Sequence, residues 1–250
     1  MKRIAILVVC LAVCFLAAPT AHAKPPKVVA GAAACGLKAM PFAVNNTWTW
    51  KAGNQQVTLK VTEVAPGKDW SGKPATVITV EELYQGRVIK NQLTCTPAGG
   101  LVVPLESILF TGEPGGGVAT TFTVKDRDSV TFPPDAQLTD GFGWVEKVKA
   151  EVTGADAGGA GAKHAPGAVE IERHVHLEGG ANEVLTTLAQ WKTTQKIVFE
   201  LRGRGEVGTE KVEIPIKRPG AYYLVKGLGF VKIEDAFDKS WELVETNLIK

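Results

Sequence analysis

Residues 56–61 of the 250-residue chain read Gln-Val-Thr-Leu-Lys-Val, and polar and apolar side chains alternate throughout. Because successive side chains of a β-strand point to opposite faces, this period of two places Val57, Leu59 and Val61 on one face. The other face then carries polar side chains to solvent. The stretch predicts a half-buried strand, which is typical of an antiparallel sheet with one wet face.

The next two segments also have the residue pattern of β-strands. Residues 75–83 are rich in Val, Ile and Thr, and Gln85-Gly86 connects them to residues 87–95. A short glycine-containing turn between two such runs indicates a β-hairpin. Alternation places four side chains on the inner face of the second segment: Ile89, Asn91, Leu93 and Cys95.

Further strands are predicted along the rest of the chain, at 99–104, 118–125, 144–153, 168–178, 193–202, 205–216, 221–225, 228–234 and 239–245. Four inward side chains are expected in 144–153, namely Trp144, Val148, Ala150 and Val152. Turns such as Pro66-Gly67 and Pro219-Gly220 join the strands, and no helical pattern long enough for a crossover separates them. The sequence therefore predicts an all-β fold with a single antiparallel, strongly curved sheet, an open half-barrel or a sandwich, with at most one or two short helices.

One stretch has two interpretations. Asn182 can cap a short helix in which four apolar residues recur at helical spacing, namely Val184, Leu185, Leu188 and Trp191. Residues 182–191 are equally compatible with a bend between two strands.

Two segments are low in periodicity. Residues 24–45 begin with Pro25, Pro26 and a Gly/Ala-rich run, and they are expected to form an extended arm. Residues 154–168 are too rich in glycine and alanine to bury apolar area, so they predict a flexible loop. We interpret that loop as an insertion in a single β domain over 46–250, the alternative being a linker between two domains.

The first 23 residues have the parts of a signal peptide: basic Lys2 and Arg3, an apolar run over 4–18, and a small-residue site ending at Ala23. The run holds about 15 residues, whereas a membrane-spanning helix needs about 20. The sequence thus predicts cleavage after Ala23, no transmembrane segment in the mature chain, and a secreted or periplasmic location. A lipid anchor is not expected, because Val9 precedes Cys10.

Removal of the leader has two consequences. Only Cys35 and Cys95 remain, in a compartment that permits disulfides. One bridge would close a loop of about 60 residues and stabilise the fold by about 2–4 kcal/mol, the alternative being two buried free thiols. The leader also contains two of the 28 basic residues and none of the 26 acidic ones, so the mature chain is neutral. Nothing in that balance favours a nucleic-acid partner or attachment to anionic lipid by overall charge.

The strongest candidate for chemistry is an alternating set on 168–178: Glu170, Glu172, His174, His176 and Glu178. A period of two places all five on one face. Two histidines at i and i+2, His174 and His176, can share a metal, and zinc would need a third ligand from another strand or from His164. The alternative, which we favour, is the solvated face of an antiparallel strand with no cofactor.

Other catalytic patterns find no match. The mature chain has four serines outside any GxSxG turn: Ser71, Ser107, Ser129 and Ser240. The glycine runs that begin at Gly115 and Gly158 carry no Lys-Ser pair for a phosphate. Two pairs of neighbouring acids are expected to be solvated: Asp126 with Asp128, and Glu81 with Glu82. We expect no enzyme, the alternative being a metal-dependent enzyme centred on His174 and His176.

Two segments carry a family resemblance. Residues 40–50 (MPFAVNNTWTW) and 222–232 (YYLVKGLGFVK) resemble the opening and closing strands of a group of uncharacterised secreted bacterial β-rich proteins. Residues 188–192 stand where that group has a Pro-Ala-Gly-x-Phe bend, without its proline and glycine. The resemblance implies a long meander curved into an open half-barrel, similar in outline to the periplasmic carriers of lipoproteins. It also implies a concave apolar face.

Eight aromatic side chains fall on predicted strands or their ends: Trp48, Trp50, Trp144, Trp191, Trp241, Tyr222, Tyr223 and Phe230. They either line a groove or form ordinary core, and core is favoured. We expect an exported, non-catalytic envelope protein that binds an apolar, lipid-like ligand or a partner chain on its concave face. The alternative is a structural or interaction module of the cell surface without a pocket, which a filled interior would favour.

Overall fold

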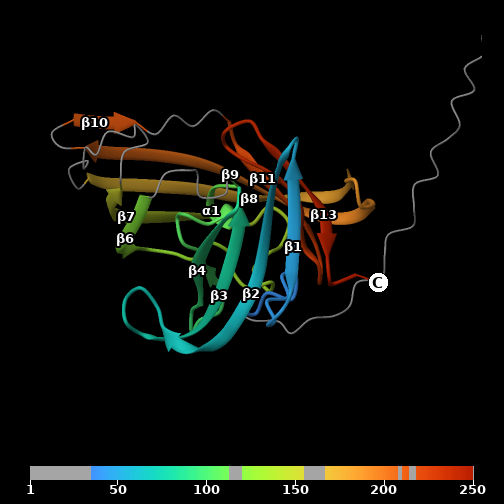
Figure 1. Cartoon of the computed structure of the whole chain (residues 1–250), viewed down its shortest axis with the longest axis horizontal. Helices are drawn as coiled ribbons and strands as arrows, with labels where there is room; N and C mark the ends of the chain where they lie inside the picture. Colours follow the sequence, from blue (N-terminus) through green and yellow to red (C-terminus); the bar gives the residue numbers. More distant parts are fainter. Residues whose placement is uncertain (1–34, 113–119, 155–166, 208–209, 214–217, 250) are drawn as a thin grey trace, which may run out of the picture.

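The computed structural model describes residues 35–112, 120–154, 167–207, 210–213 and 218–249. These residues form thirteen strands and one short helix (Figure 1). Their bounds are β1 (Thr47–Ala52), β2 (Gln55–Lys68), β3 (Pro74–Tyr84), β4 (Arg87–Cys95), β5 (Leu101–Val102), α1 (Ile108–Thr111), β6 (Thr120–Arg127), β7 (Gly143–Gly154), β8 (Gly167–Leu185), β9 (Gln190–Val207), β10 (Glu210–Glu213), β11 (Gly220–Val225), β12 (Gly229–Glu234) and β13 (Ser240–Thr246). Within the described ranges, no helix has the length and hydropathy needed to span a bilayer. The predicted signal peptide with its cleavage site after Ala23 lies outside these ranges.

The described strands form one antiparallel sheet, which confirms the predicted all-β fold. Their order is β5-β4-β3-β2-β1-β13-β12-β11-β9-β8-β7-β6, and β10 pairs with β9. The first and last strands meet in the middle of the sheet, where Trp48 faces Thr246. The two ends of this order are therefore β5 and β6, which are consecutive along the chain.

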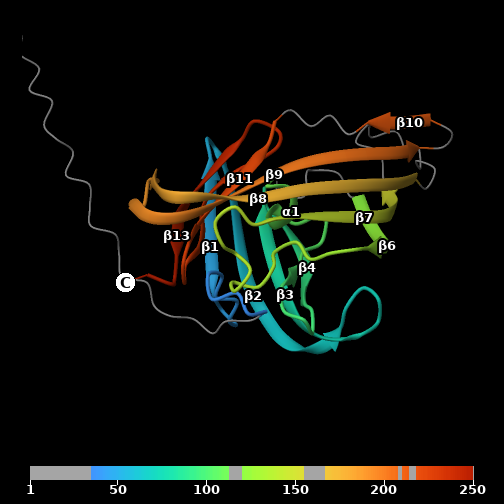
Figure 2. The ribbon, with the colours of Figure 1, turned by 180° about the vertical axis from the view of Figure 1, so that it is seen from behind.

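The sheet folds over on itself. Figures 1 and 2 show β7, β8 and β9 running across β1 to β4 rather than alongside them. The register of β2 shifts between Val61 and Glu63, and such irregularities bend a strand and increase its twist. A backbone bridge between Leu101 and Phe132 joins β5 to the loop that follows β6. The two edges thus approach each other, although the sheet does not close into a barrel.

Residues 103–112, which follow β5, fill the concave face of this curved sheet. Ile108, Leu109 and Phe110 of α1 are completely buried. The helix ends at Gly112, whose φ is +79°, and a Cβ there would lie 2.9 Å from the Cα of Asp235. Glycine satisfies both the left-handed backbone and this close approach. The interior is therefore filled by the chain itself.

Tyr222 of β11 lies at the centre of the filled interior. Its ring centroid is 4.7 Å from that of Phe199 and 4.8 Å from that of Phe230. Its hydroxyl oxygen lies 3.1 Å from the Leu109 carbonyl and 3.0 Å from the Phe110 carbonyl, to which it donates. The interpretation of the aromatics as core is confirmed for the six that are at most 2% exposed: Trp48, Trp50, Trp191, Trp241, Tyr222 and Phe230.

The helix considered over 182–191 does not form. Strand β8 continues to Leu185, β9 begins at Gln190, and a tight turn connects them. Val184 and Trp191 are partners across this hairpin, and both are buried. Of the apolar residues that matched a helical spacing, Val184, Leu185 and Trp191 belong to two strands that fold back on each other, and Leu188 lies in their connection.

The strand predicted over 205–216 is divided. Strand β9 extends to Val207, and the chain then turns back so that Glu210 of β10 faces Val207. The described residues therefore contain a hairpin where one strand was expected. Strand β5 is also shorter than the predicted 99–104.

Residues 35–45, which were expected within an extended arm, instead contribute to the core. Leu37, Met40 and Phe42 are at most 4% exposed. The Phe42 ring lies edge-on to Trp48, with ring centroids 5.9 Å apart. A few apolar residues in a Gly/Ala-rich stretch are thus enough to fix its end against the sheet.

Candidate functional site

The predicted acid and histidine set lies on one face of β8, as alternation indicated. The intervening side chains face inward, and Ile171, Arg173, Val175 and Leu177 are at most 8% exposed. His174 Nε2 lies 2.7 Å from Glu172 Oε1, and His176 Nε2 lies 3.8 Å from Glu178 Oε1. Each histidine therefore turns to a carboxylate of its own strand.

The two histidines do not form a metal centre with the side chains around them. Across the strand neighbours, His174 faces Val145 and Glu200, while His176 faces Gly143. In the described part of the chain, no group of three His, Cys, Asp or Glu side chains is placed to hold a metal ion. His164, the third ligand considered from sequence, lies outside the described residues.

Ion pairs cover the outer face of β6 to β9. Lys196 Nζ lies 2.7 Å from Glu178 Oε2, and its hydrogen bond and charge hold the pKa of Glu178 below its usual range. Lys125 pairs with Glu151 at 2.9 Å. A surface hollow of about 670 Å³ over these strands is lined by both signs of charge, including Arg204. Positive and negative side chains balance each other on this face, so it does not favour a strongly charged partner.

A buried group of charges escaped the sequence analysis. Arg127 of β6, Glu146 of β7 and Arg173 of β8 are 5%, 0% and 0% exposed, and we call them the Arg-Glu-Arg cluster. Arg127 Nη1 lies 3.4 Å from Glu146 Oε1, and Arg173 Nη1 lies 3.8 Å from Glu146 Oε2. Burial raises the pKa of Glu146, and the two guanidinium groups oppose that rise.

The Arg-Glu-Arg cluster fixes the segment that fills the concave face. Arg127 Nη1 donates to the Val103 carbonyl at 3.0 Å, and the Val103 N–H donates to Thr131 Oγ1 at 3.0 Å. Arg173 Nη1 donates to the Thr131 carbonyl at 2.9 Å, and Thr131 Oγ1 donates to Glu146 at 3.0 Å. Arg127 thus bonds Val103 directly, whereas Glu146 and Arg173 hold Thr131, whose hydroxyl accepts from the Val103 N–H.

Aromatic rings surround the Arg173 guanidinium. Its Cζ lies 5.0 to 5.7 Å from the ring centroids of four residues: Phe110, Phe132, Phe199 and Tyr222. Its Nε and Nη2 have no hydrogen-bond partner among the described residues. Ring faces attract a desolvated cation by about 2 kcal/mol, which offsets part of the cost of burying it. The Arg173 side chain is completely buried among these rings, an arrangement that supports the core.

Glu82, expected to be solvated, is completely buried. Its carboxylate accepts hydrogen bonds from Asn91 Nδ2 at 3.0 Å, from the Ile108 N–H at 3.2 Å and from Ser107 Oγ. Burial raises the pKa of Glu82, and these donors oppose the rise. The expectation was wrong because alternation along β3 puts this position on the inner face, where it holds the start of α1.

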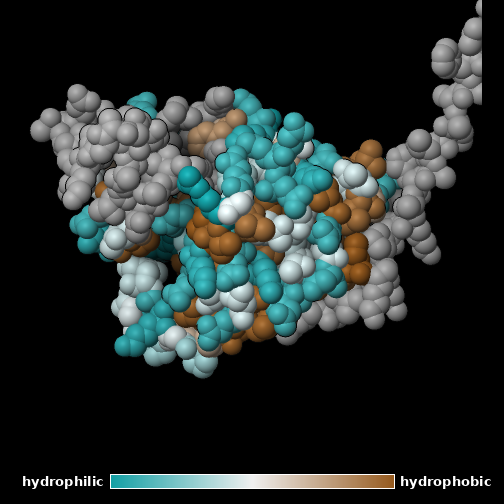
Figure 3. All heavy atoms as spheres, in the orientation of Figure 1, coloured by the Kyte–Doolittle hydropathy of each residue, from teal (hydrophilic) through white to brown (hydrophobic). Residues whose placement is uncertain are grey.

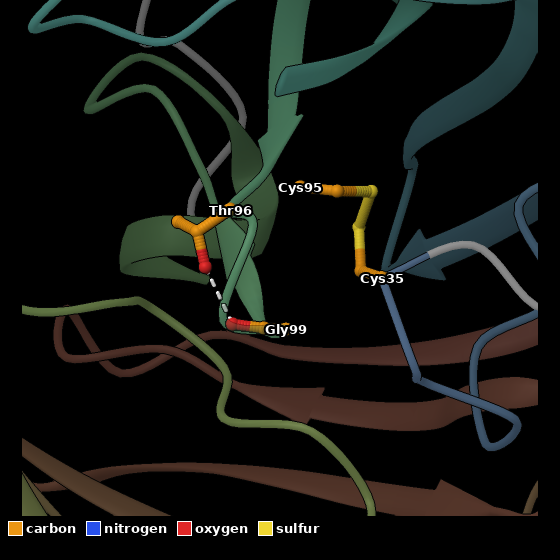
Figure 4. Close-up of a disulfide and its surroundings, with 4 residues drawn as sticks. All are labelled: Cys35, Cys95, Thr96 and Gly99. Atoms are coloured by element: carbon orange, nitrogen blue, oxygen red, sulfur yellow. Dashed lines mark hydrogen bonds between the residues drawn. A yellow bond between two sulfur atoms is a disulfide. The ribbon is translucent and has the colours of Figure 1, made fainter. Parts of the chain in front are cut away.

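The disulfide between Cys35 and Cys95 is present (Figure 4). It joins the chain before β1 to the end of β4, across a sequence separation of 60 residues. The Gly100 N–H donates to the Cys35 carbonyl at 3.0 Å, and Thr96 Oγ1 donates to the Gly99 carbonyl. The bridge therefore fastens residues 35–45 to the sheet beside β5.

Comparison with known proteins yields fold-level likenesses at low identity. No family model and no curated protein matches the chain. A protein from Bacteroides fragilis, assigned as exported and with a YmcC-like fold, aligns with a TM-score of 0.48 and 10% identity over 83% of this chain and 98% of its own. A protein from Parabacteroides distasonis assigned as a lipoprotein aligns with a TM-score of 0.46 and 14% identity over 84% of this chain and 98% of its own.

Proposed function

We propose that the chain is an exported, non-catalytic protein of the cell envelope that acts through contacts on its outer surface. The filled concave face carries this proposal. The segment between β5 and β6 buries five apolar side chains there: Val103, Leu105, Ile108, Leu109 and Phe110. A carrier of an apolar ligand needs a concave apolar pocket of several hundred Å³. Here the chain's own side chains occupy that place.

The hydrogen bonds made by this segment support its being a permanent part of the core rather than a movable lid. If residues 103–110 moved out, the Arg-Glu-Arg cluster would lose the Val103 carbonyl, and Tyr222 would lose both of its acceptors. Leaving a buried hydrogen-bonding group without its partner costs about 1–3 kcal/mol, and Arg127 and Tyr222 would each lose such partners. An apolar ligand would have to repay that cost before it bound. The interaction module therefore fits the geometry better than the lipid-like carrier does.

Lipid analysis tests the choice between carrier and interaction module. The mature chain is purified from the periplasm without detergent, and native mass spectrometry is combined with extraction of bound lipid. We expect an intact mass that begins at Lys24 and no lipid in a stoichiometric amount. One lipid per chain would overturn the proposal in favour of a carrier.

Photo-crosslinking in living cells tests the surface contacts. A photoreactive residue is placed at the exposed positions Val88 and Leu185, which are 57% and 58% exposed, and on the ion-paired face at Arg204. We expect a discrete adduct from at least one outer position. A chain that forms no adduct from any outer face would contradict a function based on surface contacts.

A further inference from the structure

The connection between β2 and β3 projects from the molecule. Figures 1 and 2 show it clear of all other strands at the lower edge of the ribbon. Strand β2 ends at Lys68 and β3 begins at Pro74, so residues 69–73 form the tip. Trp70 lies on this tip with its side chain 41% exposed.

Trp70 differs from the other tryptophans of the chain, all of which are described. Four are at most 2% exposed: Trp48, Trp50, Trp191 and Trp241. Trp144 is half-buried and stacks on Phe142, with ring centroids 5.7 Å apart. Trp70 is therefore the one tryptophan that the fold presents to an external partner.

The tip holds Trp70 in a fixed frame. Asp69 Oδ1 accepts hydrogen bonds from the Ser71 N–H at 2.9 Å, Ser71 Oγ at 2.8 Å and the Lys73 N–H at 2.9 Å. The Asp69 N–H donates to the Lys73 carbonyl at 2.8 Å. A partner that binds the indole does not have to order the loop first, which preserves affinity.

Two lysines stand on either side of Trp70 in the sequence of the tip. Lys68 and Lys73 are both exposed, and the one carboxylate of the tip, Asp69, is directed to the loop's own donors. An indole settles at the boundary between hydrocarbon and headgroups, and lysine stems extend along apolar surface while their ammonium groups reach phosphates. An exposed tryptophan between two lysines matches this chemistry better than it matches a flat protein surface.

We propose that the β2–β3 tip docks on the headgroup region of an anionic lipid bilayer, with Trp70 at the interface and Lys68 and Lys73 on lipid phosphates. The proposal deepens the proposed function, because it names a partner for the outer surface. The test of this proposal uses added vesicles. A negative result with vesicles would therefore not affect the lipid extraction, which tests the proposed function. A docked tip would place the body of the sheet beside the membrane.

Vesicle sedimentation and tryptophan emission test the proposal on the mature chain. Vesicles of phosphatidylcholine with about 30% phosphatidylglycerol are compared with vesicles of phosphatidylcholine alone. The phosphatidylglycerol gives the vesicles a negative surface potential. We expect sedimentation with the anionic vesicles and a shift of emission to shorter wavelength, which Trp70→Ala abolishes. Lys68→Gln combined with Lys73→Gln should lower the partition coefficient by about tenfold or more. Lys51→Gln combined with Lys60→Gln, which removes two exposed charges elsewhere, should bind like the unmodified chain.

Thermal unfolding of each variant verifies that the fold is kept, as expected for exposed positions. Equal sedimentation of Trp70→Ala, equal binding to neutral vesicles, or no sedimentation of the unmodified chain would each overturn the proposal. Binding to purified peptidoglycan that depends on Trp70, without binding to vesicles, would also overturn it and would assign the tip to stacking on a sugar.

Discussion

Arg173 Nη1 lies 3.8 Å from Glu146 Oε2, and neither side chain reaches solvent. The carboxylate also faces Arg127, so one negative group serves two positive ones inside an all-β core. Arg127 holds the Val103 carbonyl of the segment that fills the concave face, and the other two side chains hold Thr131, which accepts from the Val103 N–H. The buried ion pairs and the packing of this segment on the concave face therefore support each other.

Glu146→Gln keeps the shape of the side chain and removes its charge. We expect a loss of about 3–5 kcal/mol in the free energy of unfolding, because two guanidinium groups are left buried without their counter-charge. Urea denaturation measures this loss. Glu200→Gln, at an exposed position on β9, should change stability by less than about 0.5 kcal/mol. Equal stability of the two variants would contradict a supporting role for the cluster.

Glu82→Gln should make the stability of the chain less dependent on pH. Burial raises the pKa of Glu82 in the folded state, so the folded chain binds its proton more tightly than the unfolded chain does. The contribution of Glu82 to stability is therefore greatest below its unfolded pKa of about 4.3 and falls as pH rises through the folded pKa. The free energy of unfolding of Glu82→Gln minus that of the unmodified chain should rise from acidic to neutral pH. A difference that is flat with pH, as expected for the exposed control Glu81→Gln, would count against this assignment.

Cys35→Ser combined with Cys95→Ser should destabilise the chain by about 2–4 kcal/mol, because the bridge limits the freedom of the unfolded state. Denaturant midpoints with and without dithiothreitol provide the measurement. The reductant should lower the midpoint of the unmodified chain and leave that of the double variant unchanged. A midpoint of the unmodified chain that ignores the reductant would show that the bridge does not form in solution.

His174→Ala combined with His176→Ala should leave metal content and stability unchanged, because each histidine pairs with a carboxylate of its own strand on the outer face of β8. Elemental analysis of the purified chain and of the variant is the measurement. A stoichiometric metal that the double variant loses would revive the metal-dependent enzyme considered from sequence.

Gly220→Ala should destabilise the chain by about 1–3 kcal/mol through overpacking. Gly220 faces Phe199 across β11 and β9, and a Cβ on Gly220 would lie 2.1 Å from Phe199 Cζ. Gly220→Ala combined with Phe199→Leu should lose less than the sum of the single variants, since the smaller side chain frees the space. Strict additivity of the two losses would argue against this contact.

Much of the sheet could be predicted because its strands alternate. The period of two located β2, β3, β4, β7 and β8 and correctly placed Asn91 inside. The same parity puts Glu146 on the inner face between Trp144 and Val148, although it was left out of the predicted core. A charged residue at a position predicted to face inward, such as Glu146, was thus the feature of the sequence that indicated a buried ion pair.

The pairing of these charges could not be predicted. Arg127, Glu146 and Arg173 come together only when β6, β7 and β8 align, and nothing local to each residue specifies that register. The four-residue α1 is too short to show a helical period, and it depends on a tertiary contact, the hydrogen bonds to Glu82. Trp70 was not predicted as a binding residue, because the exposure of one aromatic side chain on a turn is decided by the tertiary fold and not by the local sequence.

The pairing of β1 with β13 bears on the order in which the molecule can form. Thr246 Oγ1 donates to the Thr47 carbonyl across a sequence separation of 199 residues. For a chain that is threaded across a membrane from its N-terminus, β1 arrives first and waits with one unpaired edge until almost the last residue follows. Contacts so distant in sequence form slowly, because a long loop must close before they are made. In a chain exported as proposed, completion of the sheet would therefore follow translocation, and the waiting edge would be the part of the newly arrived chain most in need of protection from aggregation.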